Sequence, residues 1–213
     1  MKQKSPAGAK RIQMVTDMQN ITNQHIVLAS GSPRRQELLR QIGLDAFGVV
    51  VPRADETYPA GLSPQDTVAH IARAKAEAAK ALTAPEDVVV TADTMVFLDD
   101  ERLGKPRDEA DALRMLAALS GRRHTVCTGV TVRRGDKYKC FTVSTDVYFR
   151  SLSAEELRAY VASGEPMDKA GAYGIHGLGA LLVERIDGDY FNVMGLPLLA
   201  LSRTLREFGI NLL

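Results

Sequence analysis

The chain lacks tryptophan, contains only two cysteines and has no run of about 18 apolar residues. Without such a run, no segment is long enough to form a membrane-spanning helix. Cys127 and Cys140 match neither a zinc motif nor a redox motif, so we expect two reduced, buried thiols in a cytoplasmic protein. The chain also has no large excess of positive or negative charge, because 27 basic and 26 acidic residues leave a net charge of +1. No global basic field therefore points to nucleic acid or to a membrane surface as a partner.

The composition is that of an ordinary globular protein, with 45% hydrophobic and 25% charged residues. A length of 213 residues suits one domain or two closely joined lobes. Residues 1–24 are basic but lack the apolar segment of a signal peptide, so we interpret them as a disordered N-terminal extension. Residues 25–213 then form a single domain.

Strand and helix patterns alternate along the domain. A capping box at Ser63, with Pro64 at the first helical position, starts one helix, and Ser153 with Glu156 starts another. Strands are expected at 25–29, 47–51, 88–98, 125–133, 138–150 and 180–186, and helices at 33–42, 64–82, 108–121, 153–163 and from 197. This order predicts an α/β fold with a mixed sheet and flanking helices.

Two adjacent arginines, Arg34 and Arg35, occupy the first turn of the helix that begins after Ser32. The helix dipole disfavours cations there by about 0.3–1 kcal/mol each. A free helix N-terminus offers N–H groups to an anion, and two guanidinium groups would bind it more tightly. The alternative is a pair of solvated surface arginines, but their pairing after a Gly/Ser turn favours a phosphate site.

Several other charged residues are not explained by packing. Asp93 interrupts an otherwise apolar strand, where charge burial disfavours it. Lys75 lies on the apolar stripe of its helix, where a snorkelling side chain is an equally good explanation. Lys105 lies in a short loop after the strand that contains Asp93, and Glu56 lies in the polar segment 53–61. Two carboxylates, two lysines and two arginines together match polyphosphate chemistry, in which carboxylates hold a divalent metal and cations neutralise phosphate oxygens.

The histidines contribute less. His25 and His70 are typical of surface positions and His124 begins a strand, so a structural interpretation is preferred for all three. His176 differs because it lies in a glycine-rich stretch.

Seven short motifs follow one another along the chain: ASGSPRRQELL at 29–39, ARAKA at 72–76, ADT at 92–94, GKP at 104–106, LSGR at 119–122, EPMDKAGAYGI at 165–175 and VMGLP at 193–197. In this order they resemble the motifs of the Maf family, the septum-formation-inhibitor-like nucleotide pyrophosphatases. The resemblance covers essentially residues 26–210. One such motif would be weak, but seven in the right order are highly specific.

This resemblance implies an elongated α/β fold in two lobes around a cleft, similar to the inosine-triphosphate pyrophosphatases. It also implies a homodimer, a divalent metal (Mg²⁺ or Mn²⁺) and Asp93 as the catalytic base, which also binds the metal with Glu56. Lys75 and Lys105 would assist catalysis, while Arg34 and Thr94 are tied to substrate choice. The implied substrate-binding residues are Ser32, Arg34, Arg35, Thr94, Asp168, Lys169 and His176.

The motif at 165–175 resembles the family branch that hydrolyses dTTP and UTP to the monophosphate and pyrophosphate. That branch usually has glutamine where this chain has His176. A glutamine amide offers both a donor and an acceptor to a pyrimidine, and neutral histidine offers one of each in a different geometry. Two alternatives stay open: a pyrophosphatase of different base specificity, such as for 7-methyl-GTP, and a nucleotide-binding regulator of septum formation without significant turnover.

Overall fold

The computed structural model describes residues 25–213, and the extension expected at residues 1–24 lies outside this range. Seven strands in the described part form one sheet in the order β2-β1-β3-β5-β6-β7, with β4 paired to β3. β1 is parallel to β2 and β3, and the other pairs are antiparallel. The strands are β1 Ile26–Ala29, β2 Gly48–Val50, β3 Val88–Leu98, β4 Glu101–Leu103, β5 Arg123–Arg134, β6 Lys137–Phe149 and β7 Val183–Asp187.

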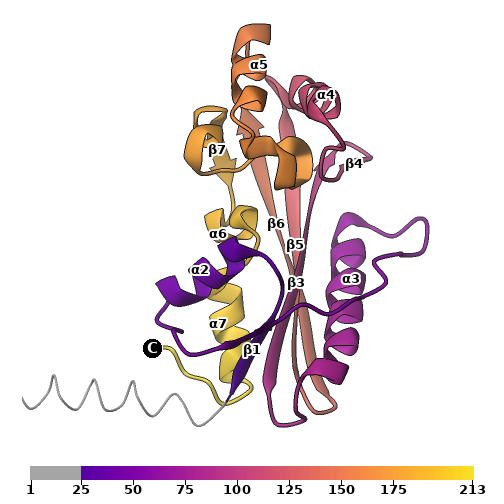
Figure 1. Ribbon diagram of the computed structural model, residues 1–213, viewed down its shortest axis with the longest axis vertical. Coiled ribbons are helices and arrows are strands. Elements are labelled where there is room, and N and C mark those ends of the chain that lie inside the picture. Colours follow the sequence, from indigo (N-terminus) through magenta and orange to yellow (C-terminus); the bar gives the residue numbers. More distant parts are fainter. Residues whose placement is uncertain (1–24) are drawn as a thin grey trace, which may run out of the picture.

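Helices cover both faces of this sheet and one of its ends. The α-helices are α2 Pro33–Gln41, α3 Pro64–Ala78, α4 Glu109–Leu119, α5 Ala154–Ala162, α6 Tyr190–Met194 and α7 Leu198–Arg206, and the 3₁₀ helices are η2 Ala79–Leu82, η3 Glu165–Asp168, η4 Ala170–Ala172 and η5 Gly177–Leu181. Figure 1 shows β3, β5 and β6 running along the molecule, with α3 on one side and α2, α6 and α7 on the other. None of the helices in residues 25–213 is long and apolar enough to cross a membrane.

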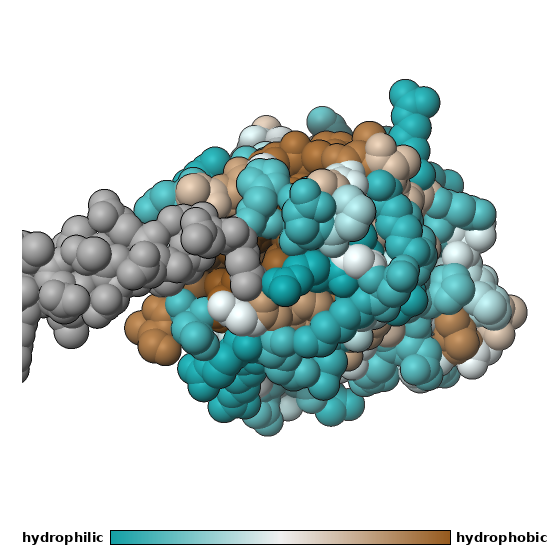
Figure 2. Space-filling model, turned by 90° about the horizontal axis from the view of Figure 1, so that it is seen from below, coloured by the Kyte–Doolittle hydropathy of each residue, from teal (hydrophilic) through white to brown (hydrophobic). Residues whose placement is uncertain are grey.

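Two hydrophobic clusters divide the molecule into two lobes. One packs α2 and α7 against the strands around β1, and the other packs α4 and α5 against the opposite end of the sheet. Leu39 and Leu201 are fully buried in the first cluster, and Leu116 and Leu119 in the second. Seen from the end opposite α5, the surface is largely hydrophilic with smaller hydrophobic areas (Figure 2). The expected elongated α/β fold with a mixed sheet and flanking helices is therefore confirmed.

Several local expectations need correction. The sequence predicts one strand over 180–186, but Gly177 and Gly179 favour a 3₁₀ helix that extends to Leu181, and β7 begins only at Val183. The short strand β4 and the one-and-a-half-turn helix α6 were not expected, because both are too short to show a periodic pattern. Cys127 is buried as expected, but the prediction for Cys140 was wrong, because this residue is exposed on β6.

The histidine interpretations agree with the structure. His25 and His70 are exposed, whereas His124 is 2% exposed and its Nε2 lies 2.7 Å from the hydroxyl oxygen of Tyr173. Burial lowers the pKa of His124 to about 4, so this ring is neutral at physiological pH.

Helix α3 approaches the sheet closely at a glycine. Gly129 of β5 pairs with Asp93 of β3, and a methyl group at residue 129 would overlap the backbone carbonyl of Val68 in α3 and lie 2.7 Å from the nitrogen of Ala69. No residue with a side chain fits there without moving the helix. The glycine therefore sets the distance between α3 and the strand that carries Asp93.

Replacement of this glycine tests the close approach. We expect Gly129→Ala to lower the free energy of unfolding by about 2–3 kcal/mol, because an added methyl group forces the helix away from the sheet. Chemical denaturation measures the change. Gly104→Ala is the control, since a methyl group there meets no atom within 4 Å. Equal stability of the two variants would contradict the packing described here.

Candidate active site

The site begins at a gap in the sheet along one edge of β3. Strand β1 pairs with β3 only at Val88–Val90, and β4 pairs only at Val96–Leu98. Within the described residues, no strand pairs with that edge of residues 91–95, so its polar backbone groups need other partners. The carboxyl end of β1 also points to this gap, and that is where ligands bind in open α/β sheets.

A cleft of about 950 Å³ lies at the gap. It receives side chains from the loop after β1, from α3, from the middle of β3 and from the segment that follows η3. The structure places all eleven residues expected at the site along its wall: Ser32, Arg34, Arg35, Glu56, Lys75, Asp93, Thr94, Lys105, Asp168, Lys169 and His176.

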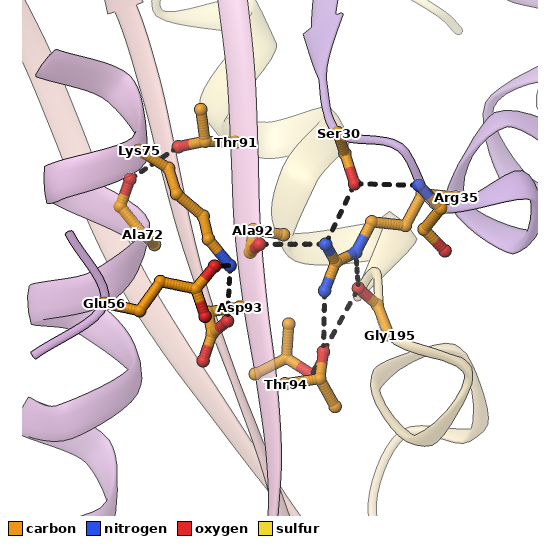
Figure 3. A network of polar contacts seen from close by, with 12 residues as sticks. Ser30, Arg35, Glu56, Ala72, Lys75, Thr91, Ala92, Asp93, Thr94 and Gly195 are labelled. Atoms are coloured by element: carbon orange, nitrogen blue, oxygen red, sulfur yellow. Dashed lines mark hydrogen bonds and ion pairs between the residues drawn. The ribbon is translucent and has the colours of Figure 1, made fainter. Parts of the chain in front are cut away.

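An ion pair between α3 and β3 lies at the centre of the cleft. Lys75 Nζ donates to Asp93 Oδ1 at 2.7 Å and lies 3.1 Å from Glu56 Oε1 (Figure 3). The side chain of Asp93 is only 10% exposed, and that of Lys75 only 17%. Asp93 Oδ2 is buried and has no hydrogen-bond partner among residues 25–213. One oxygen of Asp93 is thus fixed by Lys75, and the other has no partner in the described structure.

Arg35 connects three segments of the chain rather than pointing freely into the cleft. Its guanidinium group donates to the carbonyl of Ala92 at 2.8 Å, to that of Gly195 at 2.9 Å, and to the hydroxyl groups of Ser30 and Thr94 at 3.1 Å each (Figure 3). The Ala92 carbonyl belongs to the unpaired edge of β3. Burial lowers the pKa of Arg35 to about 10, with Asp93 opposing the shift, so the group stays charged at neutral pH.

Arg34 faces the opposite wall of the cleft. Its Nη1 lies 3.1 Å from Asp168 Oδ2, while Lys169 Nζ lies 2.7 Å from Asp168 Oδ1. Asp168 is exposed and Arg34 is half-buried, so this pair is open to solvent. The two adjacent arginines therefore differ in environment, and only Arg34 is placed to meet a ligand without losing several protein contacts.

The remaining wall adds further groups. Lys105 is exposed after β4, and Thr94 Oγ1 lies 3.0 Å from Thr128 Oγ1 behind the cleft. Two residues not expected from the sequence, Tyr58 and Arg102, also line it, with the guanidinium carbon of Arg102 4.7 Å from the centre of the Tyr58 ring. Neither belongs to a recognisable pattern, and their contact joins segments that only the fold brings together.

The geometry defines a class of protein. An α/β cleft combines a helix N-terminus, a half-buried arginine, three lysines and a carboxylate fixed by one of those lysines, which is the arrangement expected for a phosphoanhydride-binding site. The model of the family described as "Maf-like protein" matches residues 25–208. The chain belongs to the Maf family.

Curated relatives agree with this assignment. A "dTTP/UTP pyrophosphatase" of Vibrio cholerae is 50% identical over 188 residues, covering 88% of this chain and 100% of the relative. A protein of the same name from Symbiobacterium thermophilum is 50% identical over 186 residues, covering 87% and 95%. A solved HAM1 protein from Coxiella burnetii gives a TM-score of 0.48 at 14% identity and covers 86% of this chain and 99% of its own, which is too distant to add to the assignment.

The two arginines can be compared directly by conservative substitution. We expect Arg35→Lys to lower the free energy of unfolding by about 2 kcal/mol or more, because an ammonium group cannot reproduce a forked set of four hydrogen bonds. Arg34→Lys is the matched control and should cost less than about 1 kcal/mol, since it affects one partly exposed ion pair. Chemical denaturation checks both, and similar losses would argue against a clamp at Arg35.

Proposed function

We propose that this chain is a nucleoside triphosphate pyrophosphatase that hydrolyses dTTP and UTP to the monophosphate and pyrophosphate. The observation that carries the proposal is the buried Asp93 carboxylate, held on one oxygen by Lys75 and free on the other, in a cleft lined by cations. The names of the curated relatives support the same substrates.

In this proposal Asp93 acts as the general base. Its Oδ2 accepts a proton from a water molecule, the water oxygen bonds to the α-phosphorus, and the bond from that phosphorus to the bridging oxygen breaks. Pyrophosphate leaves with the bridging oxygen. Lys75 fixes the orientation of the carboxylate, as a base must be positioned before its proton affinity matters.

The cations of the cleft would bind the triphosphate. Arg34 lies at the N-terminus of α2, and Lys105 approaches from the loop after β4. Both can neutralise charge that develops on the leaving pyrophosphate, and most of the acceleration would come from such positioning and electrostatics. Lys169 and Asp168 belong to the opposite wall and would contribute to substrate binding from there.

A divalent metal, Mg²⁺ or Mn²⁺, is part of the proposal. Within residues 25–213 no group of three or more acidic, histidine or cysteine side chains could hold a metal by itself. Glu56 and Asp93 nevertheless both contact the same ammonium group, so their carboxylates converge on one point. This donor set fits Mg²⁺, which usually binds one or two carboxylates together with substrate phosphates. When bound, the metal would neutralise phosphate oxygens.

Substitution of the base tests the proposed function. We expect Asp93→Asn to reduce pyrophosphate release from dTTP and UTP by at least about 100-fold, because a general base contributes typically 10²–10⁴-fold. EDTA should abolish release by the wild type, and Mg²⁺ or Mn²⁺ should restore it. Nucleotide binding, measured by calorimetry, is expected to persist in the variant. Wild-type turnover in Asp93→Asn would remove the base from the mechanism.

The side chain at residue 176 tests the choice of base. His176 is half-buried in the cleft wall, and its Nδ1 is buried without a hydrogen-bond partner in the described structure. We expect His176→Gln to increase the preference for UTP and dTTP over CTP and GTP, because an amide directs its donor and acceptor toward the same side, whereas the two ring nitrogens of histidine point apart. Ratios of kcat/KM for the four nucleotides check this. Unchanged ratios would show that residue 176 does not contact the base.

We also propose that the chain is cytoplasmic, and that it forms a homodimer, as the family resemblance implies. Sedimentation equilibrium tests the oligomeric state. The second candidate function, a nucleotide-binding regulator without turnover, is disfavoured by the fixed carboxylate beside the phosphate-binding cations, because binding alone does not need a base there. Nucleotide binding without any pyrophosphate release would favour that regulator.

A further inference from the structure

The glycine-rich segment 174–181 forms one wall of the cleft through Gly174, Ile175 and His176. A single carboxylate outside the cleft holds its far end. Glu165 accepts hydrogen bonds from the backbone nitrogen of Leu178 at 3.0 Å and from that of Gly179 at 3.0 Å. It also accepts one from the hydroxyl group of Tyr160 at 2.9 Å. Neither Glu165 nor Tyr160 lines the cleft.

The segment is packed against these two side chains without spare room. Gly177 has a φ of +63°, and a methyl group there would lie 2.7 Å from Glu165 Oε2. A methyl group on Gly179 would lie 2.7 Å from the hydroxyl oxygen of Tyr160 and would overlap the carbonyl of Gly174. The two glycines thus allow the backbone to approach the carboxylate and the phenol closely.

The same two residues reach the cleft wall itself. The hydroxyl oxygen of Tyr160 accepts a hydrogen bond from the nitrogen of Gly174 at 3.2 Å. The backbone carbonyl of Glu165 accepts one from Lys169 Nζ at 2.6 Å. Lys169 is only 8% exposed, so its ammonium group depends on such partners for its position. Glu165 and Tyr160 therefore together hold Lys169, Gly174 and the turn after His176 in place.

We propose that Glu165, acting with Tyr160, is a positioning residue that fixes the cleft wall carrying His176 and Lys169 for nucleotide binding. This inference rests on the proposed function for its substrate. Glu165 touches neither the base nor the phosphates. Its carboxylate holds the turn after His176, its backbone carbonyl holds Lys169, and the wall positioned in this way discriminates between nucleotides. Loss of the carboxylate acts on affinity and selectivity, while Asp93 and Lys75 on the other side of the cleft keep their geometry.

The proposal is tested with Glu165→Gln, which keeps the size of the side chain but removes its charge and one acceptor oxygen. We expect KM for UTP to rise about tenfold, since hydrogen bonds to a charged group are lost, while kcat changes less than about threefold. Calorimetry with UMP should show a similar loss of affinity, and the UTP to CTP ratio of kcat/KM should fall. Glu155→Gln, at an exposed position on the neighbouring helix α5, is the matched control and should leave these values unchanged.

Tyr160→Phe removes a single hydroxyl group and provides a second, milder variant that keeps the test valid if Glu165→Gln does not fold. It should shift KM for UTP and the affinity for UMP in the same direction by a smaller factor. A lowered melting temperature with unchanged KM, UMP affinity and UTP to CTP ratio would overturn the proposal and leave Glu165 a purely structural residue. If the wild type binds UMP but releases no pyrophosphate, the proposed function fails, and the UMP affinities still decide the role of Glu165.

Discussion

The ion pair between Lys75 and Asp93 is the interaction on which the rest of the site depends. An isolated carboxylate in the middle of a strand would lose its hydration without compensation. Lys75 supplies that compensation from α3 at 2.7 Å, and it can do so because α3 lies directly against the sheet at Gly129. Removing one partner of such a pair leaves the other charge buried without compensation. The pair therefore constrains the position of α3 relative to β3.

The second constraint is the interrupted edge of β3. Because β1 pairs with β3 only up to Val90 and β4 only from Val96, the sheet has a gap beside the middle of β3. Arg35 donates a hydrogen bond to the carbonyl of Ala92 on this unpaired edge. It also donates to the carbonyl of Gly195, which brings that turn to the same place. Half-buried Arg35 thus closes the back of the cleft, while the front stays open to a polyanion.

The sequence predicted a large part of this arrangement. Asp93 is recognisable because an aspartate is out of place in an apolar strand, and Arg34 because a cation is out of place at a helix N-terminus. The structure places both residues in one cleft with the other expected site residues. Capping residues such as Ser63 and Ser153 also gave the helix starts correctly, because capping depends on local hydrogen bonds.

Other features depend on contacts between distant segments and could not be predicted. Nothing local distinguishes Arg35, which makes four hydrogen bonds to the protein, from Arg34, which faces Asp168. The ambiguity at Lys75, between a snorkelling side chain and an ion pair, is decided only when α3 packs on β3. Strand order, the short strand β4 and the contact between Tyr58 and Arg102 follow in the same way from the assembled sheet.

In the proposed mechanism Asp93 directs water to the α-phosphorus of a nucleoside triphosphate. Hydrolysis of UTP in water enriched in ¹⁸O, followed by mass spectrometry of both products, shows which phosphorus the water attacks. We expect one ¹⁸O atom in UMP and none in pyrophosphate, because the bridging oxygen leaves with pyrophosphate. Label in pyrophosphate instead of UMP would place the attack at the β-phosphorus and contradict this mechanism.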